Sequence, residues 1–188
     1  MTLKIIAGKY KGRLLCTPKA KTTRPTQGML REAVFNICQM HVEGARVLDL
    51  YAGSGAMGFE ALSRGASHVT FIERDRGAAL CIKKNIEVLS VADQATLIPL
   101  DAKAALKRLS GAFDLIYIDP PYDISPLPIL EELLLRSLLS EGAILFLEER
   151  FTPQKTSKPL SLPQLTLVSQ RRFGTALLHQ YTRSSSSV

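Results

Sequence analysis

The fold is decided by the stretch Val47-Leu48-Asp49-Leu50-Tyr51-Ala52-Gly53-Ser54-Gly55-Ala56-Met57-Gly58. Its first residues are typical of a buried strand, the glycines predict a tight turn, and a helix is expected to follow. The turn contains the pattern G-x-G-x-x-G, which often marks a dinucleotide site. Glu73 lies twenty residues beyond Gly53, where an acidic residue would hold ribose hydroxyls. The pattern alone leaves the class of nucleoside cofactor open.

Four carboxylates help to distinguish between the possible cofactors. They lie at or just beyond the ends of four successive predicted strands, and open α/β sheets bind ligands at the carboxyl ends of their strands. Together they would repel a pyrophosphate. They suit S-adenosylmethionine, which carries a sulfonium, an amine and ribose hydroxyls but no phosphate, so the glycines would serve close backbone approach. The four are Asp49, Glu73, Asp101 and Asp119.

The tetrapeptide Asp119-Pro120-Pro121-Tyr122 indicates the chemistry. An exocyclic amino group on a nucleobase is a poor nucleophile, because its lone pair is delocalised into the ring. A carboxylate and a backbone carbonyl that each accept one N–H would localise that lone pair toward a methyl donor, and Asp119 with the carbonyl of Pro120 could do so. Two prolines stiffen the turn, and Tyr122 could stack on the base. The alternative is an ordinary strand followed by a Pro-Pro turn.

Strand and helix patterns alternate from residue 46 onward. We predict strands over 46–51, 68–73, 95–100, 113–119 and 143–148, and helices over 57–63, 77–89, 102–109 and 126–138. This βαβ construction predicts an α/β fold with a parallel sheet covered on both faces. The chain should end in a hairpin of strands 164–170 and 175–182.

The positive charge is concentrated near the N-terminus. The chain has a net charge of +7, and residues 1–46 hold nine basic residues against two acidic ones, so this quarter accounts for the whole excess. Such a patch attracts a polyanion through counterion release, although a basic surface that only aids solubility is the alternative. Two short strands, 3–7 and 13–16, should flank a turn that presents Lys9, Lys11 and Arg13 to phosphates. A helix capped by Thr26 and reaching Met40 is expected next.

The chain resembles the class I S-adenosylmethionine-dependent methyltransferases, and more narrowly the bacterial family that methylates guanine N2 of 16S ribosomal RNA. Beyond the two motifs above, the resemblance rests on 6–13 (IAGKYKGR), 24–26 (RPT), 31–36 (REAVFN) and 60–66 (EALSRGA). Departures are small: the family commonly has glycine where Ala7 stands, and the tail after Tyr181 does not resemble the family. The resemblance implies a Rossmann-like, seven-stranded, mostly parallel sheet with an antiparallel last strand. It also implies guanine 966 of the small-subunit RNA as the target.

Site roles follow from the chemistry and the resemblance together. Gly53 and Gly55 would admit the cofactor, Asp49 would orient its amino group, and Glu73 would hold the ribose. Ala52 and Ser54 could add main-chain contacts to the methionine end of the cofactor. The resemblance implies that Asp101 reads the adenine amino group, with Ala102 supplying a backbone donor, although Asp101 is also a plausible helix cap. It further implies that Arg24 and Arg31 place RNA or shape the entrance, a surface ion pair being the alternative.

The remaining features suggest a small cytoplasmic protein. The start carries no apolar stretch long enough for a signal peptide, and the leucine-rich 127–139 is too short and too charged to span a membrane. Three scattered cysteines without ligand spacing predict reduced thiols and no metal. We expect a monomer with a basic RNA-binding extension (1–45), a methyltransferase domain (46–183) and a flexible tail (184–188).

Three other functions remain open at this stage. A DNA adenine-N6 or cytosine-N4 methyltransferase would use the same D-P-P-Y turn, but usually needs a further domain to read the major groove. A nicotinamide oxidoreductase would use the glycine turn, but the acidic residues predicted around that turn argue against this function. A non-catalytic RNA-binding assembly factor would need neither motif for chemistry.

Overall fold

The computed structural model describes residues 3–18, 25–152 and 159–184. Arg24, which we expected to contact RNA, and the tail 185–188 lie outside these ranges. The described elements are α1 (Pro25–Ile37), β1 (Arg46–Leu50), α2 (Ala56–Ser63), β2 (His68–Ile72), α3 (Arg76–Leu89), β3 (Ala95–Ile98), α4 (Ala102–Leu106), β4 (Phe113–Ile118), α5 (Leu127–Leu135), β5 (Leu139–Arg150), β6 (Leu165–Phe173) and β7 (Ala176–Arg183), with short 3₁₀ turns at Gln39–His41 and Ala92–Gln94.

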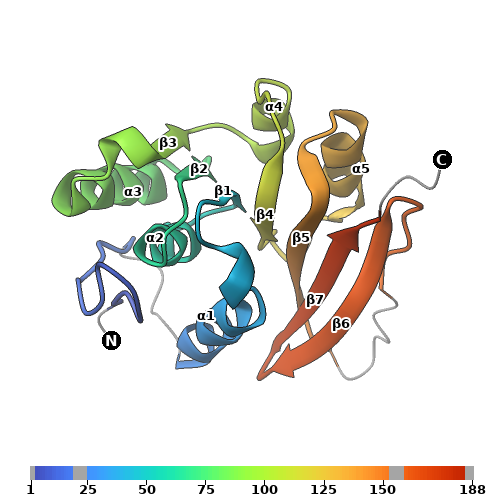
Figure 1. Ribbon diagram of the computed structural model, residues 1–188, viewed down its shortest axis with the longest axis horizontal. Helices are drawn as coiled ribbons and strands as arrows, with labels where there is room; N and C mark the ends of the chain where they lie inside the picture. Colours follow the sequence, from blue (N-terminus) through green and yellow to red (C-terminus); the bar gives the residue numbers. More distant parts are fainter. Residues whose placement is uncertain (1–2, 19–24, 153–158, 185–188) are drawn as a thin grey trace.

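The seven strands form one sheet in the order β3-β2-β1-β4-β5-β7-β6 (Figure 1). The pairs among β1 to β5 are parallel, whereas β7 is antiparallel to both β5 and β6. The predicted α/β fold, with a mostly parallel sheet and an antiparallel last strand, is confirmed. The strand order reverses between β1 and β4, and this is where open α/β sheets bind ligands.

The helices cover both faces of this sheet. One face packs against α1, α2 and α3 through a cluster that includes Phe35, Phe59 and Ile82, and the other packs against α4 and α5 through Leu106 and Leu130. The central strands are therefore buried on both sides, which explains their continuous apolar character. No helix in the described ranges is both long enough and apolar enough to cross a membrane.

Several predicted boundaries were wrong. Helix α1 begins at Pro25, so Thr26 lies inside it rather than capping it, and the helix ends at Ile37 because a separate 3₁₀ turn carries Met40. Strand β5 begins at Leu139, four residues early, because it pairs with Phe113 before the β4 register shift. Helix α4 stops at Leu106.

The N-terminal hairpin is much less regular than expected. A single antiparallel bridge joins Lys4 to Leu14, with Ile5 N donating to Arg13 O at 3.1 Å. It is stabilised by packing on the rest of the protein, because Leu3, Ile5 and Leu15 are buried in the same cluster as residues of α1 and α2. The extension and the core thus share one hydrophobic cluster.

Candidate active site

The glycine turn connects β1 to α2 through left-handed backbone. Tyr51, Gly53 and Gly55 have φ values of 60°, 58° and 77°. A Cβ on Gly55 would lie 2.7 Å from Phe59 Cε2, and one on Gly58 would lie 2.2 Å from Phe71 Cε1. The absence of a side chain at Gly55 therefore allows the left-handed backbone of the turn beside Phe59. The absence of one at Gly58 allows α2 to pack closely on β2.

Two of the predicted acidic residues shape this turn directly. Asp49, which is 2% exposed, accepts a hydrogen bond from Gly58 N at 3.0 Å. Glu73 accepts from Gly53 N at 2.7 Å and from Asp75 N at 2.7 Å. Burial raises the pKa of Asp49 to about 8, and the nearby carboxylates of Asp119 and Glu73 raise it further. The hydrogen bond from Gly58 N acts in the opposite direction and lowers it. Asp49 therefore lacks a positive partner among the groups that set its pKa.

Asp101 caps a helix, which is one of its two predicted roles. Its carboxylate caps α4 by accepting from Lys103 N at 3.0 Å, and it lies 3.8 Å from Arg74 Nη1 at an exposed position. Ala102 is the buried first residue of that short helix. The helix-cap alternative is thus present in the structure, and the adenine contact stays a prediction.

The D-P-P-Y turn follows β4 directly. Asp119 N donates to Leu50 O at 3.4 Å, which places the turn against the end of β1. Pro120 is buried, and the carbonyl of Pro121 accepts from Ile124 N at 2.9 Å, which closes the turn. Tyr122 is 60% exposed, with the guanidinium of Arg150 5.5 Å from its ring centre. This exposed ring could receive a base.

One pocket of about 90 Å³ brings the two motifs together. The predicted residues Asp49, Ala52, Gly53, Ser54 and Asp119 all line it. Gly55, Glu73, Asp101, Ala102, Pro120, Pro121 and Tyr122 lie outside its lining. The pocket therefore joins the glycine turn to the carboxylate of the D-P-P-Y turn.

The pocket also includes a buried pair that the sequence analysis missed. Tyr117 donates its hydroxyl hydrogen to Glu148 Oε2 at 2.5 Å, and both residues line the pocket. Burial and the Glu148 carboxylate raise the pKa of Tyr117 well above its usual range. The one available sequence signal was the acidic residue Glu148, which directly follows the apolar run of β5.

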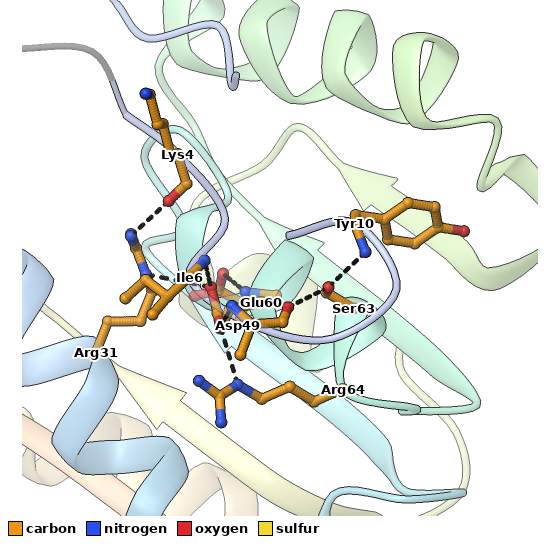
Figure 2. Close-up of polar contacts among 10 residues, drawn as sticks. Lys4, Ile6, Tyr10, Arg31, Asp49, Glu60, Ser63 and Arg64 are labelled. Atoms are coloured by element: carbon orange, nitrogen blue, oxygen red, sulfur yellow. Dashed lines mark hydrogen bonds and ion pairs between the residues drawn. The ribbon is translucent and has the colours of Figure 1, made fainter. Parts of the chain in front are cut away.

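The predicted RNA-binding residues divide into two groups. Lys9, Lys11 and Arg13 are exposed on the hairpin, although Arg13 also donates to Val88 O at 3.2 Å. Arg31 is buried and lies 3.6 Å from Glu60 Oε2 (Figure 2), so the alternative of a surface ion pair is wrong. Arg31 lines the pocket beside the glycine turn rather than the exposed basic surface.

The residues present fit S-adenosylmethionine. The pocket offers a buried carboxylate and open glycine backbone, and the buried Nε of Arg31 has no hydrogen-bond partner among the described residues. The carboxylates of Asp119 and Glu148 would disfavour a phosphate-rich dinucleotide. The fold, the switch point of the sheet and this pocket define a class I S-adenosylmethionine-dependent methyltransferase.

Comparison with known proteins narrows this class to a family. The model of the family described as Conserved hypothetical protein 95 matches residues 3–182, and the chain belongs to this family. The chain is 33% identical over 177 residues to Ribosomal RNA small subunit methyltransferase D of Haemophilus influenzae, covering 92% of this chain and 89% of that protein. It is 41% identical over 124 residues to YlbH of Bacillus subtilis, provisionally described as an rRNA methyltransferase, covering 64% and 67% of the two chains.

The same likeness extends to solved structures. The structure of yhhF from Escherichia coli, provisionally described as a methyltransferase, superposes with a TM-score of 0.87 at 28% identity, and the match covers 99% of this chain and 100% of that one. The superposition includes the N-terminal extension as well as the sheet.

Proposed function

We propose that this protein transfers a methyl group from S-adenosylmethionine to the exocyclic amino nitrogen of a guanine, N2, in small-subunit ribosomal RNA. The observation that carries the proposal is the placement of Asp119 in the same pocket as Asp49 and the glycine turn. Ribosomal RNA as the substrate class is supported by the similarity to Ribosomal RNA small subunit methyltransferase D of Haemophilus influenzae. The particular nucleotide, guanine 966, is part of the proposal.

The D-P-P-Y turn would orient the target nitrogen. Asp119 accepts one N–H of the guanine amino group and the carbonyl of Pro120 accepts the other, so that the lone pair points into the pocket. Bound S-adenosylmethionine supplies an electrophilic methyl group. Tyr122, exposed beside Arg150, stacks on a base that has left its helix. The nitrogen loses its remaining proton to solvent after transfer, so no general base is required.

The other predicted residues would hold the cofactor. Asp49 takes its amino group, Glu73 its ribose hydroxyls and Asp101 its adenine, while Ala52, Gly53, Ser54, Gly55 and Ala102 supply backbone contacts. Glu73 already accepts two backbone N–H groups, which leaves its second lone pairs for hydroxyl donors. Orientation of the two reactants would then supply much of the rate enhancement.

The basic extension would bring the RNA to this pocket. Exposed Lys9, Lys11 and Arg13 lie on a hairpin that is fixed to the core, and Arg24 is assigned the same role from its sequence position. A ribosomal substrate would place the activity in the bacterial cytoplasm. We propose that the protein acts as a monomer on an assembling or complete small subunit.

The decisive experiment is mass spectrometry of nucleosides from undermethylated small subunits, incubated with S-adenosylmethionine and the protein. We expect new N2-methylguanosine. Asp119→Ala should lower the rate about 100-fold or more. Asp123→Ala is the matched control, because it removes an exposed carboxylate from the same turn.

Other products would contradict the proposal in different ways. Methylated adenine or cytosine would replace the guanine assignment. Absence of any methylated nucleoside in subunits and in naked 16S RNA, despite measurable cofactor binding, would overturn the ribosomal assignment. Full activity of Asp119→Ala would overturn the assigned chemistry.

A further inference from the structure

Arg31 is a buried cation whose hydrogen-bond donors are only partly paired. Its residue surface is 5% exposed, and its Nη2 donates to Lys4 O at 2.8 Å. Its Nε has no hydrogen-bond partner among the described residues. Burial lowers the pKa of Arg31, and it outweighs the attraction of Glu60. A buried guanidinium donor without a partner is costly, so an additional acceptor should stabilise this site.

Glu60 cannot supply that acceptor fully, because other donors already occupy it. Its two oxygens accept from Ile6 N at 2.8 Å, Ala7 N at 3.0 Å and Arg64 Nε at 2.8 Å, while Arg31 Nε lies 3.6 Å away (Figure 2). Glu60 thus fixes the extension on α2 and forms an ion pair with Arg31 Nε that is too long to be a hydrogen bond. Arg31 itself lines the pocket, beside Asp49 and the glycine turn.

The pocket restricts the kind of anion that could reach Arg31. A phosphate would face the carboxylates of Asp119 and Glu148 in the same pocket. An α-amino acid brings an ammonium group beside its carboxylate, and so complements a pocket that holds one buried cation among carboxylates. S-adenosylmethionine has such a group at its methionine end.

We propose that Arg31 binds the methionine carboxylate of S-adenosylmethionine while Asp49 takes the adjacent amino group. This inference rests on the proposed function and assigns Arg31 to the cofactor instead of the RNA. Because the same guanidinium holds Lys4 O, it also connects the cofactor to the basic extension. Arg31 would therefore help the extension and the cofactor to stabilise one another.

Binding of two cofactor forms to the full-length protein tests this assignment without any turnover. Calorimetry would compare S-adenosylmethionine with its decarboxylated analogue, which keeps the amine and lacks the carboxylate. For Arg31→Gln, we expect affinity for S-adenosylmethionine to fall about 10- to 100-fold. Affinity for the decarboxylated analogue should hold or improve, since a buried cation that repels it has been removed.

Arg64→Gln is the matched control, because Arg64 also pairs with Glu60 but does not line the pocket. It should change both affinities about equally and by less than about threefold. Arg31→Lys, which keeps the charge, should lose less affinity than Arg31→Gln and provides the comparison if the neutral variant does not fold.

The outcomes separate this inference from the proposed function. An equal loss of affinity for both ligands in Arg31→Gln would overturn the inference and would mean that Arg31 has only a structural role. If Arg31→Gln is unfolded, the same result in Arg31→Lys would have the same meaning. Unchanged affinity for S-adenosylmethionine would also overturn it. Failure of the unmodified protein to bind either ligand would overturn the proposed function itself, together with this inference.

Discussion

Asp49 is a buried carboxyl whose charge is disfavoured by its surroundings. Burial is the main cause of its raised pKa of about 8, against a usual value of 3.8, and Asp119 and Glu73 contribute. The folded protein therefore keeps a proton on Asp49 at neutral pH, whereas the unfolded chain has lost it. A ligand ammonium group next to Asp49 would oppose this shift, because a nearby positive charge favours the ionised carboxylate.

The retained proton on Asp49 should make the free energy of unfolding depend on pH. Between about pH 4 and pH 8 the folded state binds the extra proton, so the free energy of unfolding should fall as pH rises, by up to about 1.4 kcal/mol per pH unit from this group. Urea unfolding at pH 5, 6 and 7 would measure this slope. Asp49→Asn should lack this contribution, and saturating S-adenosylmethionine should reduce it in the unmodified protein. Equal slopes for both proteins without cofactor would contradict an elevated pKa.

Individual residues differ in how far sequence alone could assign them. Asp49, Gly53 and Asp119 were predictable because each lies in a short local pattern at the end of a strand. Arg31 was predicted to place RNA or shape the entrance, but its contacts with Lys4, 27 positions away, and with Glu60 could not be predicted, because they arise only from packing. Glu148 was missed for the same reason, since its partner Tyr117 is 31 positions away.

At the scale of elements, the N-terminal hairpin is held by its fit to α2 rather than by its own strands. Lys9 N donates to Ser63 O at 2.7 Å, and Tyr10 N to Ser63 Oγ at 2.9 Å. Gly8 makes this approach possible, because a Cβ there would lie 1.7 Å from Ser63 O. The strand pattern predicted a hairpin but could not show that contacts with another element hold it in place.

Two glycines in this hairpin provide a matched test. Gly8 and Gly12 have φ values of +79° and +80°, but a Cβ on Gly12 would meet nothing within 4 Å. Gly12→Ala should therefore cost only the backbone strain, about 1 to 2 kcal/mol. Gly8→Ala should cost about 3 kcal/mol or more, because the hairpin must move away from α2.

Urea unfolding would give the two free energies, and limited proteolysis would show whether the hairpin has separated. Selective cleavage within 3–18 is expected only for Gly8→Ala. Similar losses of stability in both variants would mean that the close approach to Ser63 contributes little.

At the scale of the whole molecule, the extension reaches from the basic hairpin to the cofactor turn. Asn85 in α3 accepts from Cys16 N at 2.7 Å, and its Nδ2 donates to Cys16 O at 3.1 Å and to Ser54 O at 3.2 Å. One buried amide thus joins the extension, α3 and the glycine turn. The parallel sheet was predictable from the alternation of strands and helices, whereas this connection was not, because its members are far apart in sequence.

Two of the three cysteines, which look scattered in the sequence, meet at this connection. Cys16 Sγ lies 3.1 Å from Cys81 Sγ, and burial raises the pKa of Cys81 to about 11, with the neighbouring Cys16 adding to the shift. Diamide should oxidise this pair to an intrachain disulfide, with both thiol hydrogens passing to the reagent. The reaction should be faster at pH 9 than at pH 7, because thiolate is the attacking species. Cys38 should stay reduced, because it is fully buried and its pKa is raised to about 12.

Peptide mass mapping without reductant would identify the disulfide, and Cys16→Ser should abolish it. Because buried contacts already fix the extension to the core, the oxidised protein should bind S-adenosylmethionine within about threefold of the reduced protein. A disulfide that forms but eliminates cofactor binding would mean that the extension must move to admit the cofactor. That result would replace the fixed extension with a movable one, and Arg31, through its bond to Lys4, would then couple that movement to cofactor binding.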